Sequence, residues 1–175
     1  MKLTTKRLEL RPFEEADIND LFEIYSNEET CKYLLHEPWT DSNKMDEFSK
    51  KMAENQLTPK TPLSLACELN SKVIGDISIW YTGMKETVEF GFVFNTDFGG
   101  KGYATEALKA VIDHLFKVEK VHRIQANLDC RNIPSASLCS RLGMRQEAHF
   151  IQDFWNKGEW TDSYVYGMLE SDIET

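Results

Sequence analysis

Three β-rich runs follow one another with only short connections between them, and no other feature of the sequence restricts the fold as strongly. The runs cover residues 63–69, 72–81 and 87–94, and each is rich in apolar residues. The connections, residues 70–71 and 82–86, carry the Asn, Ser and Gly that favour turns. The sequence therefore predicts an antiparallel meander.

Further elements flank the meander and define the fold class. Period-2 or β-rich segments predict strands at residues 7–12, 122–130, 144–155 and 159–170. Apolar residues at helical spacing predict helices at residues 14–26, 103–118 and 134–142. The segment 27–62 holds short helical pieces broken by prolines and has no core of its own. We therefore expect a single α+β domain, residues 1–175, because the chain is too short for two ordinary domains.

The composition argues against several classes of protein. The net charge of −9 is unfavourable for nucleic-acid binding, and the acidic surface is explained by solubility more simply than by a cationic substrate. The four Cys include no C-x-x-C pair and the four His are scattered, so no metal site is predicted. No stretch approaches the roughly 20 apolar residues of a membrane span and no signal peptide is visible, so we expect a cytoplasmic protein.

A glycine-rich segment, FGGKGYATEA at residues 98–107, stands at the start of the longest predicted helix. Glycines in such a place free backbone N–H groups to bind an anion, since a helix N-terminus carries unpaired donors and partial positive charge. A Walker loop would need a glycine where Asn95 stands, and a dinucleotide fingerprint would need one at Thr105. A phosphate is the first expectation, and a plain strand-to-helix turn is the alternative.

Four segments spread over nearly the whole chain are similar to those of one known family. They are TKRLELRP (5–12), VEFGFVF (88–94), GKGYATEA (100–107) and CRNIPSASLCSRLGM (130–144). Together they resemble the GNAT superfamily of acyl-CoA N-acyltransferases, and within it the RimJ/RimL type of ribosomal-protein N-terminal acetyltransferase. One position departs from the family, because Asp97 stands where many members have Gln or Arg; the RimJ/RimL type relaxes this position.

The resemblance implies a fold, a reaction and a cosubstrate. The fold is a central, mostly antiparallel twisted sheet of about seven strands, with the fourth and fifth strands splayed apart and helices on its flanks. The reaction is direct transfer of an acetyl group from acetyl-CoA to a primary amine, on a protein N-terminus or a small molecule. The alternative is a non-catalytic protein of the same fold that binds coenzyme A as a sensor or regulator. Either would be a monomer or a homodimer.

The same resemblance implies where coenzyme A binds. Backbone N–H groups of the glycine loop would surround the pyrophosphate, and the unpaired part of the fourth strand would bind the pantetheine amides. The implied coenzyme-binding residues are Phe92, Val93, Phe94, Phe98, Gly99, Gly100, Lys101, Gly102, Tyr103, Ala104, Asn132 and Ser135. For Lys101 the alternative is simple exposure to solvent, and for Asn132 it is a turn residue before the helix.

Three residues are candidates for the chemistry. Glu89, beside an apolar strand, would accept the proton of the amine, because desolvation makes a carboxylate more basic. Its alternative is an exposed residue on the far face of the strand. The resemblance implies that the proton donor to the departing thiolate is Ser135 or, second, Cys139, because these residues stand at the positions where members of the family place their proposed donors. The alternatives are helix capping for Ser135 and core packing for Cys139.

The resemblance also implies that the acceptor pocket lies between the variable helical region and the final hairpin, which flank the sulfur end of the groove in this fold. Four aromatic residues are candidate walls: Trp39, Phe154, Trp155 and Trp160. Large apolar side chains in strands are more often core residues, which is the alternative for each of them. The acceptor stays open among a protein N-terminus, an amino acid, a polyamine and an amino sugar.

Overall fold

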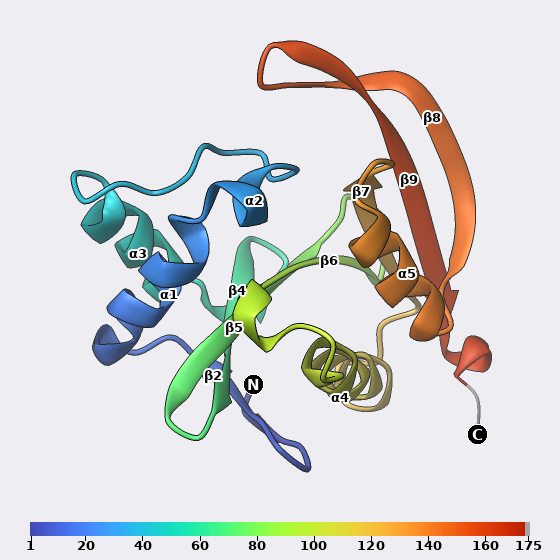
Figure 1. The fold of residues 1–175 in the computed structure, drawn as a ribbon. Coiled ribbons are helices and arrows are strands. Elements are labelled where there is room, and N and C mark those ends of the chain that lie inside the picture. The colour runs from blue at the N-terminus through green and yellow to red at the C-terminus, as the bar shows by residue number, and fades with distance from the viewer. Residues whose placement is uncertain (174–175) are drawn as a thin grey trace.

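One sheet of nine strands organises residues 1–173, the part of the chain that the computed structural model describes (Figure 1). The strands are β1 (Leu3–Thr4), β2 (Glu9–Pro12), β3 (Asn55–Thr58), β4 (Thr61–Leu69), β5 (Lys72–Tyr81), β6 (Thr87–Phe94), β7 (Arg123–Asp129), β8 (Arg145–Asn156) and β9 (Glu159–Leu169). Their order across the sheet is β1-β2-β4-β5-β6-β7-β9-β8, with β3 beside β4. Seven of these strands match the predicted ones, and β1 and β3 are short additions.

Helices lie on both faces of the sheet. They are α1 (Ile18–Tyr25), α2 (Glu28–Cys31), α3 (Lys44–Ala53), α4 (Tyr103–Lys117) and α5 (Ile133–Arg141), with 3-10 turns at Glu15–Asp17, Thr96–Phe98 and Glu170–Asp172. The predicted long helix and the predicted short helix after Pro134 are confirmed as α4 and α5. Within residues 1–173, no helix is long and apolar enough to cross a membrane.

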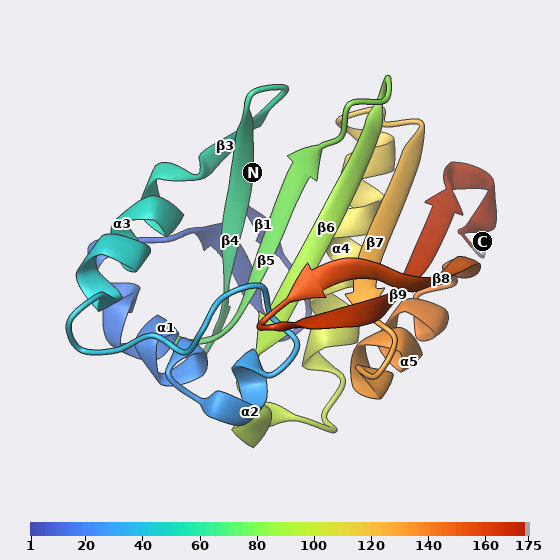
Figure 2. The same cartoon turned by 90° about the horizontal axis from the view of Figure 1, so that it is seen from above.

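The sheet splits between β6 and β7. β6 and β7 form a parallel pair, and their pairing extends only from Thr87 opposite Arg123 to Glu89 opposite Gln125. Beyond that point both strands continue, β6 to Phe94 and β7 to residue 129, but they diverge (Figure 2). β6 and β7 are the fourth and fifth of the predicted strands, so the splaying that the family resemblance implies for these two strands is confirmed.

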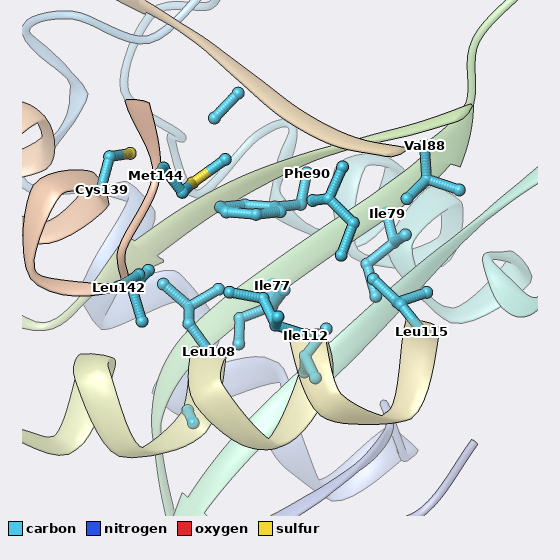
Figure 3. Close-up of a cluster of buried hydrophobic side chains, with 14 of the residues drawn as sticks. Ile77, Ile79, Val88, Phe90, Leu108, Ile112, Leu115, Cys139, Leu142 and Met144 are labelled. Atoms are coloured by element: carbon cyan, nitrogen blue, oxygen red, sulfur yellow. The ribbon is translucent and has the colours of Figure 1, made fainter. Parts of the chain in front are cut away.

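The helix α4 covers one face of the sheet beside the split. Figure 3 shows Leu108, Ile112 and Leu115 of α4 facing Ile77 and Phe90 of the strands. All five are at most 3% exposed. Full burial of a side chain of this size contributes about 1.5–3 kcal/mol, so this contact holds α4 firmly against the sheet.

The opposite face is covered by α1 and α3, which are anchored through a buried carboxylate. Asp76 of β5, only 1% exposed, accepts a hydrogen bond from the Tyr25 hydroxyl at 2.6 Å and pairs with Lys51 Nζ at 2.8 Å. A buried charge is tolerated when it is paired and hydrogen-bonded in this way. Burial, followed by the neighbouring Asp76 charge, raises the pKa of Tyr25 well above its usual value, so the phenol remains a donor.

The final hairpin, β8 and β9, arches away from the sheet (Figure 1). Its turn at Lys157 and Gly158 has φ angles of 50° and 81°, the left-handed pair that a tight two-residue hairpin needs. The tip then contacts the segment after α2, because Lys157 Nζ donates to the Cys31 carbonyl at 2.7 Å and Asn156 Nδ2 to the Leu34 carbonyl at 3.2 Å. The hairpin thereby covers the gap between β6 and β7.

Gly75 provides a test of how tightly β5 packs beside this gap. A Cβ at Gly75 would lie 2.5 Å from two ring atoms of Phe94, the last residue of β6. We predict that Gly75→Ala destabilises the protein by about 1–3 kcal/mol in urea unfolding, because the Phe94 ring must leave its position.

The matched control is Gly83→Ala in the turn before β6, where an added Cβ has nothing within 4 Å. This variant should unfold within about 0.5 kcal/mol of the wild type. Equal unfolding free energies for the two variants would show that the contact between Gly75 and Phe94 is not tight.

Candidate active site

A continuous groove follows the gap between β6 and β7. Its inner cavity, about 270 Å³, lies at the end of the β6–β7 pairing and contains Glu89; a middle cavity of about 550 Å³ follows, and an outer cavity of about 830 Å³ ends at the glycine loop. The inner and middle cavities share the residues Tyr33, Leu34, Phe92, Asn132 and Ser135. The middle and outer cavities share Phe94, Ala104 and Arg141. One extended ligand can therefore reach from the glycine loop to Glu89.

The glycine loop forms the wall of the outer cavity. Gly100 and Gly102 have φ angles of 73° and 79°, which side chains rarely adopt, and Gly102 is the N-cap residue of α4. The N–H groups of the first turn of α4 therefore point towards the cavity without helical partners. The predicted residues lining this cavity are Phe94, Phe98, Gly99, Gly100, Gly102, Tyr103 and Ala104.

Three cationic side chains line the same cavity, and the predicted Lys101 is not among them. Lys6, Lys109 and Arg141 line it. Lys101 does not; its side chain is exposed and its Nζ lies 5.8 Å from the centre of the Phe98 ring. An anion bound at the N-terminus of α4 would thus be near three positive charges that sequence reasoning missed, because they come from three distant segments.

The N-terminal segment holds the glycine loop in place. Glu106, in the first turn of α4, accepts hydrogen bonds from Thr5 Oγ1 at 2.6 Å and from the Arg7 backbone N–H at 2.8 Å. The Arg7 guanidinium pairs with the other oxygen of Glu106 at 2.6 Å and donates to the Lys101 carbonyl at 2.9 Å. Arg7 therefore links the start of α4 to the loop that precedes it.

The backbone donors of β6 divide between its two neighbours. The Asn95 N–H donates to the Ile74 carbonyl of β5 at 2.8 Å. Because donors alternate in direction along an antiparallel strand, the N–H of Val93 also points to β5, whereas those of Phe92 and Phe94 point into the gap. Phe92, Val93 and Phe94 were all expected to bind the pantetheine amides. Of the three, only Phe92 and Phe94 direct a backbone N–H into the gap.

Glu89 stands where the two strands begin to separate. It lines the inner cavity and is half-buried, so it is not the exposed residue of the alternative interpretation. Its Oε2 accepts hydrogen bonds from Gln125 Nε2 and Asn127 Nδ2, both at 2.8 Å. Among the described residues, no hydrogen bond or ion pair reaches its Oε1. The two amides orient the carboxylate and leave one oxygen for a ligand.

A second carboxylate in the inner cavity is already neutralised. Asp129 is held by two hydrogen bonds from the Arg131 guanidinium, at 2.9 and 2.7 Å, and Arg131 also pairs with Glu159 at 3.0 Å. Although burial opposes ionisation, the Arg131 hydrogen bonds keep the pKa of Asp129 below its usual value. Glu89 is therefore the better acceptor of a proton or of a cationic amine.

Asn132 and Ser135 lie together at the junction of the inner and middle cavities. Asn132 is the N-cap of α5, and its Oδ1 accepts a hydrogen bond from the Ser135 N–H at 3.2 Å. Capping, the alternative considered for Ser135, is performed by Asn132 instead. The cap uses the Asn132 oxygen and the Ser135 backbone, so the Asn132 amide nitrogen and the Ser135 hydroxyl can face a ligand.

Cys139, the other candidate proton donor, lies in the core. It is completely buried between α5 and the sheet, near Met144 (Figure 3), and it lines none of the three cavities. Burial raises the pKa of its thiol to about 12. The position of Cys139 therefore fits the alternative interpretation, in which the residue packs in the core.

Of the four aromatic residues expected around the acceptor, only Phe154 lines the inner cavity. Trp39 is buried in the second core, stacked on Tyr25 with ring centres 4.8 Å apart. Trp155 and Trp160 form an exposed pair at the hairpin tip, with ring centres 5.3 Å apart. The remaining apolar wall consists of Phe92, predicted as a coenzyme-binding residue, and of residues that were not predicted, namely Tyr33, Leu34, Leu35, Trp80, Phe90, Ala126 and Leu128.

The contact between Arg7 and Glu106 gives a pH dependence that can be tested. Although burial opposes it, hydrogen bonds from Thr5 and Arg7 hold the pKa of Glu106 below its usual value of 4.5. Since the folded-state pKa is depressed, the ionised carboxylate stabilises the fold above pH 4.5 and loses this effect as the pH falls through the folded-state value. We predict that the difference in unfolding free energy between the wild type and Glu106→Gln is constant near neutral pH and shrinks below pH 4.5.

Urea unfolding of both proteins across this range measures the difference directly. A difference that stays the same down to about pH 3, where carboxylates in the unfolded chain are protonated, would contradict the role given to the charge of Glu106.

Comparisons with known proteins agree with this geometry. Residues 7–145 match the model of a family described as an acetyltransferase (GNAT) domain. An uncharacterized N-acetyltransferase of Bacillus subtilis, YnaD, is 34% identical over 172 residues, which cover 98% of this chain and 99% of that protein.

Two solved structures have similar folds. A GNAT-family acetyltransferase from Bacillus anthracis has a TM-score of 0.88 and 30% identity, covering 98% of this chain and 99% of that chain. Spermidine N-acetyltransferase from Vibrio cholerae, solved in complex with CoA and spermine, has a TM-score of 0.78 and 21% identity, covering 95% of this chain and 97% of that chain. At 21% identity, the similarity to the Vibrio cholerae structure shows a shared fold.

Proposed function

Because this chain belongs to the GNAT acetyltransferase family, and so transfers the acetyl group of acetyl-CoA to an amine, we propose that the groove between β6 and β7 is where the transfer occurs. The observation that carries the proposal is the arrangement along one groove of the α4 N-terminus, the two free donors of β6 and the carboxylate of Glu89. The non-catalytic alternative is not favoured by this family membership.

Coenzyme A would lie along the groove with its pyrophosphate at the glycine loop. Negative phosphate oxygens are stabilised by the N–H groups of the first turn of α4 and by Lys6, Lys109 and Arg141. The N–H of Phe94 would bind an amide carbonyl of the pantetheine arm and the N–H of Phe92 would face the thioester oxygen, so that the arm takes the place of the missing neighbouring strand. The thioester would then reach the junction at Asn132 and Ser135.

The proposed binding site of the pyrophosphate is tested by Gly102→Asp. We predict that this variant loses at least about 100-fold in coenzyme A affinity, measured by calorimetry, because the new carboxylate stands beside the phosphates. Gly158→Asp is the matched control, since Gly158 has a similar φ of 81° against 79° but lies in the far hairpin turn with open space around it. It should bind coenzyme A as the wild type does. Equal affinities for the two variants would overturn the assignment of the loop.

The chemistry follows from the residues at the junction. Glu89 takes a proton from the bound ammonium group, directly or through a water molecule, and the amine nitrogen forms a bond to the thioester carbon. The carbonyl oxygen becomes negative and is stabilised by the N–H of Phe92. The carbon–sulfur bond breaks as the nitrogen loses its second proton to solvent, and the departing thiolate receives a proton from the Ser135 hydroxyl, which regains one from water. The proton taken by Glu89 passes to solvent.

The acceptor amine would occupy the inner cavity. Its walls are mainly apolar, including Leu35, Trp80 and Phe154, and the unpaired oxygen of Glu89 offers a negative charge. A primary amine on a short apolar or flexible arm matches this combination, whether on a small molecule or a protein N-terminus. The Vibrio cholerae relative was solved with spermine, a small-molecule amine of this kind. Incubation with acetyl-CoA and a panel of amines, with detection of released thiol, identifies the acceptor.

The base is tested by Glu89→Gln. The amide keeps the shape and one acceptor oxygen but cannot take a proton, so turnover at neutral pH should fall by about 100-fold to 10,000-fold while acetyl-CoA affinity stays nearly constant. The deficit should shrink as pH rises, because more of the amine then arrives deprotonated. Steady-state kinetics across pH, on an acceptor for which chemistry is rate-limiting, measures both effects.

Glu9→Gln, a carboxylate change on the exposed side of β2, is the control and should leave turnover unchanged. A Glu89→Gln enzyme that turns over as fast as this control at neutral pH would show that another group accepts the proton.

A further inference from the structure

Three potential metal ligands meet outside the groove. Cys130 follows β7, His149 lies on β8 and Asp162 lies on β9, and their ligand atoms all lie within 4.8 Å of one another. Within residues 1–173, no other three Cys, His, Asp or Glu side chains come this close in a ligand-like arrangement. The cluster was invisible in the sequence because its members are separated by 13 residues or more along the chain.

The spacing suits a tetrahedral ion. His149 Nε2 and Asp162 Oδ2 are 3.3 Å apart, longer than the about 2.8 Å of a charge-assisted hydrogen bond. Two ligands at about 2.0–2.1 Å from a tetrahedral zinc ion are about 3.3 Å apart. A thiolate at about 2.3 Å from the same ion would be about 3.6 Å from each of them, so Cys130 Sγ needs to move by little more than about 1 Å.

Other contacts already orient the three ligands. Asp162 Oδ1 accepts a hydrogen bond from the Gln152 N–H at 2.8 Å, which leaves Oδ2 facing His149. The His149 ring packs edge-on against Tyr164, with ring centres 4.9 Å apart. The Cys130 N–H donates to the Asp162 carbonyl at 3.0 Å. Metal sites commonly have such supporting contacts behind their ligands.

We propose that Cys130, His149 and Asp162 bind a divalent transition metal, with Zn²⁺ as the best match to their chemistry. A thiolate and a carboxylate neutralise its two charges, imidazole is a common third ligand, and the exposed position leaves a fourth place for water. Hard ions such as Mg²⁺ and Ca²⁺ prefer oxygen ligands and would bind poorly here.

The ion would fasten the hairpin rather than take part in acetyl transfer. Thr161 and Ser163 line the inner cavity, and side chains alternate along a strand, so Asp162 between them points to the other face of β9. The pairing of β8 with β9 is irregular between Phe150 and Phe154, close to the cluster. A metal at this bend would tie the end of β7 to the hairpin that covers the inner cavity.

Cobalt(II) is a suitable probe because a thiolate ligand gives it a charge-transfer absorption that oxygen and nitrogen ligands do not. Titration of the reduced protein under anaerobic conditions should give this band with saturation at one equivalent, and Zn²⁺ should abolish it. The other three cysteines, Cys31, Cys67 and Cys139, are buried, so the band reports Cys130.

Cys130→Ser should lose the band. His149→Gln and Asp162→Asn should each weaken metal binding by at least about 100-fold, because loss of a residue that only supports a ligand costs up to about 100-fold in metal affinity and loss of a ligand should cost more. Zn²⁺ should raise the thermal unfolding midpoint of the wild type and of the control His36→Gln, whose exposed ring lies elsewhere, but not of the three ligand variants. Unfolding curves without metal check that each variant folds.

The proposal is overturned if the wild type binds no stoichiometric cobalt, or if Cys130→Ser keeps the charge-transfer band. It is equally overturned if His149→Gln and Asp162→Asn bind as tightly as His36→Gln. None of these readouts depends on acetyl transfer, so they are independent of the proposed roles in the groove.

Discussion

The short pairing of β6 with β7 is the constraint on which the rest of the structure depends. Only three residue pairs join the strands, from Thr87 to Glu89 on β6, before they diverge. Backbone donors inside a fold cost free energy when they lack a partner, about 1–3 kcal/mol each if water is excluded. The N–H groups of Phe92 and Phe94 therefore favour a ligand that carries carbonyl groups at strand-like spacing.

The surrounding elements hold the split open from three sides. The apolar stripe of α4 fixes the helix N-terminus beside the end of β6, and the contact of Arg7 with Glu106 fixes the loop before it. On the other face, α1 and α3 are tied to β5 through Asp76. The hairpin covers the gap through its tip at Lys157. Each support uses residues distant in sequence, so the groove is a property of the whole domain.

Local patterns in the sequence predicted seven of the nine strands, α4, α5 and the glycine loop, because period and turn chemistry are local. Which atoms face the groove depends on long-range pairing, which local patterns do not show. Trp39 packs in the second core and Cys139 in the main core, whereas Val93 lines the middle cavity but turns its N–H to β5. The same reason hid Tyr33, which reaches the groove from an irregular segment. Glu89 was proposed from its local setting beside an apolar strand together with its place in the family pattern, and its side chain lines the inner cavity.

Residue-resolved amide hydrogen exchange, with and without saturating coenzyme A, tests the central claim most directly. The N–H groups of Phe92 and Phe94 point into the gap, whereas that of Val93 pairs with β5. Coenzyme A should therefore slow exchange strongly at Phe92 and Phe94 and leave the already protected Val93 nearly unchanged. Unaltered exchange at Phe92 and Phe94, under conditions where the coenzyme is shown to bind, would contradict the account of the groove.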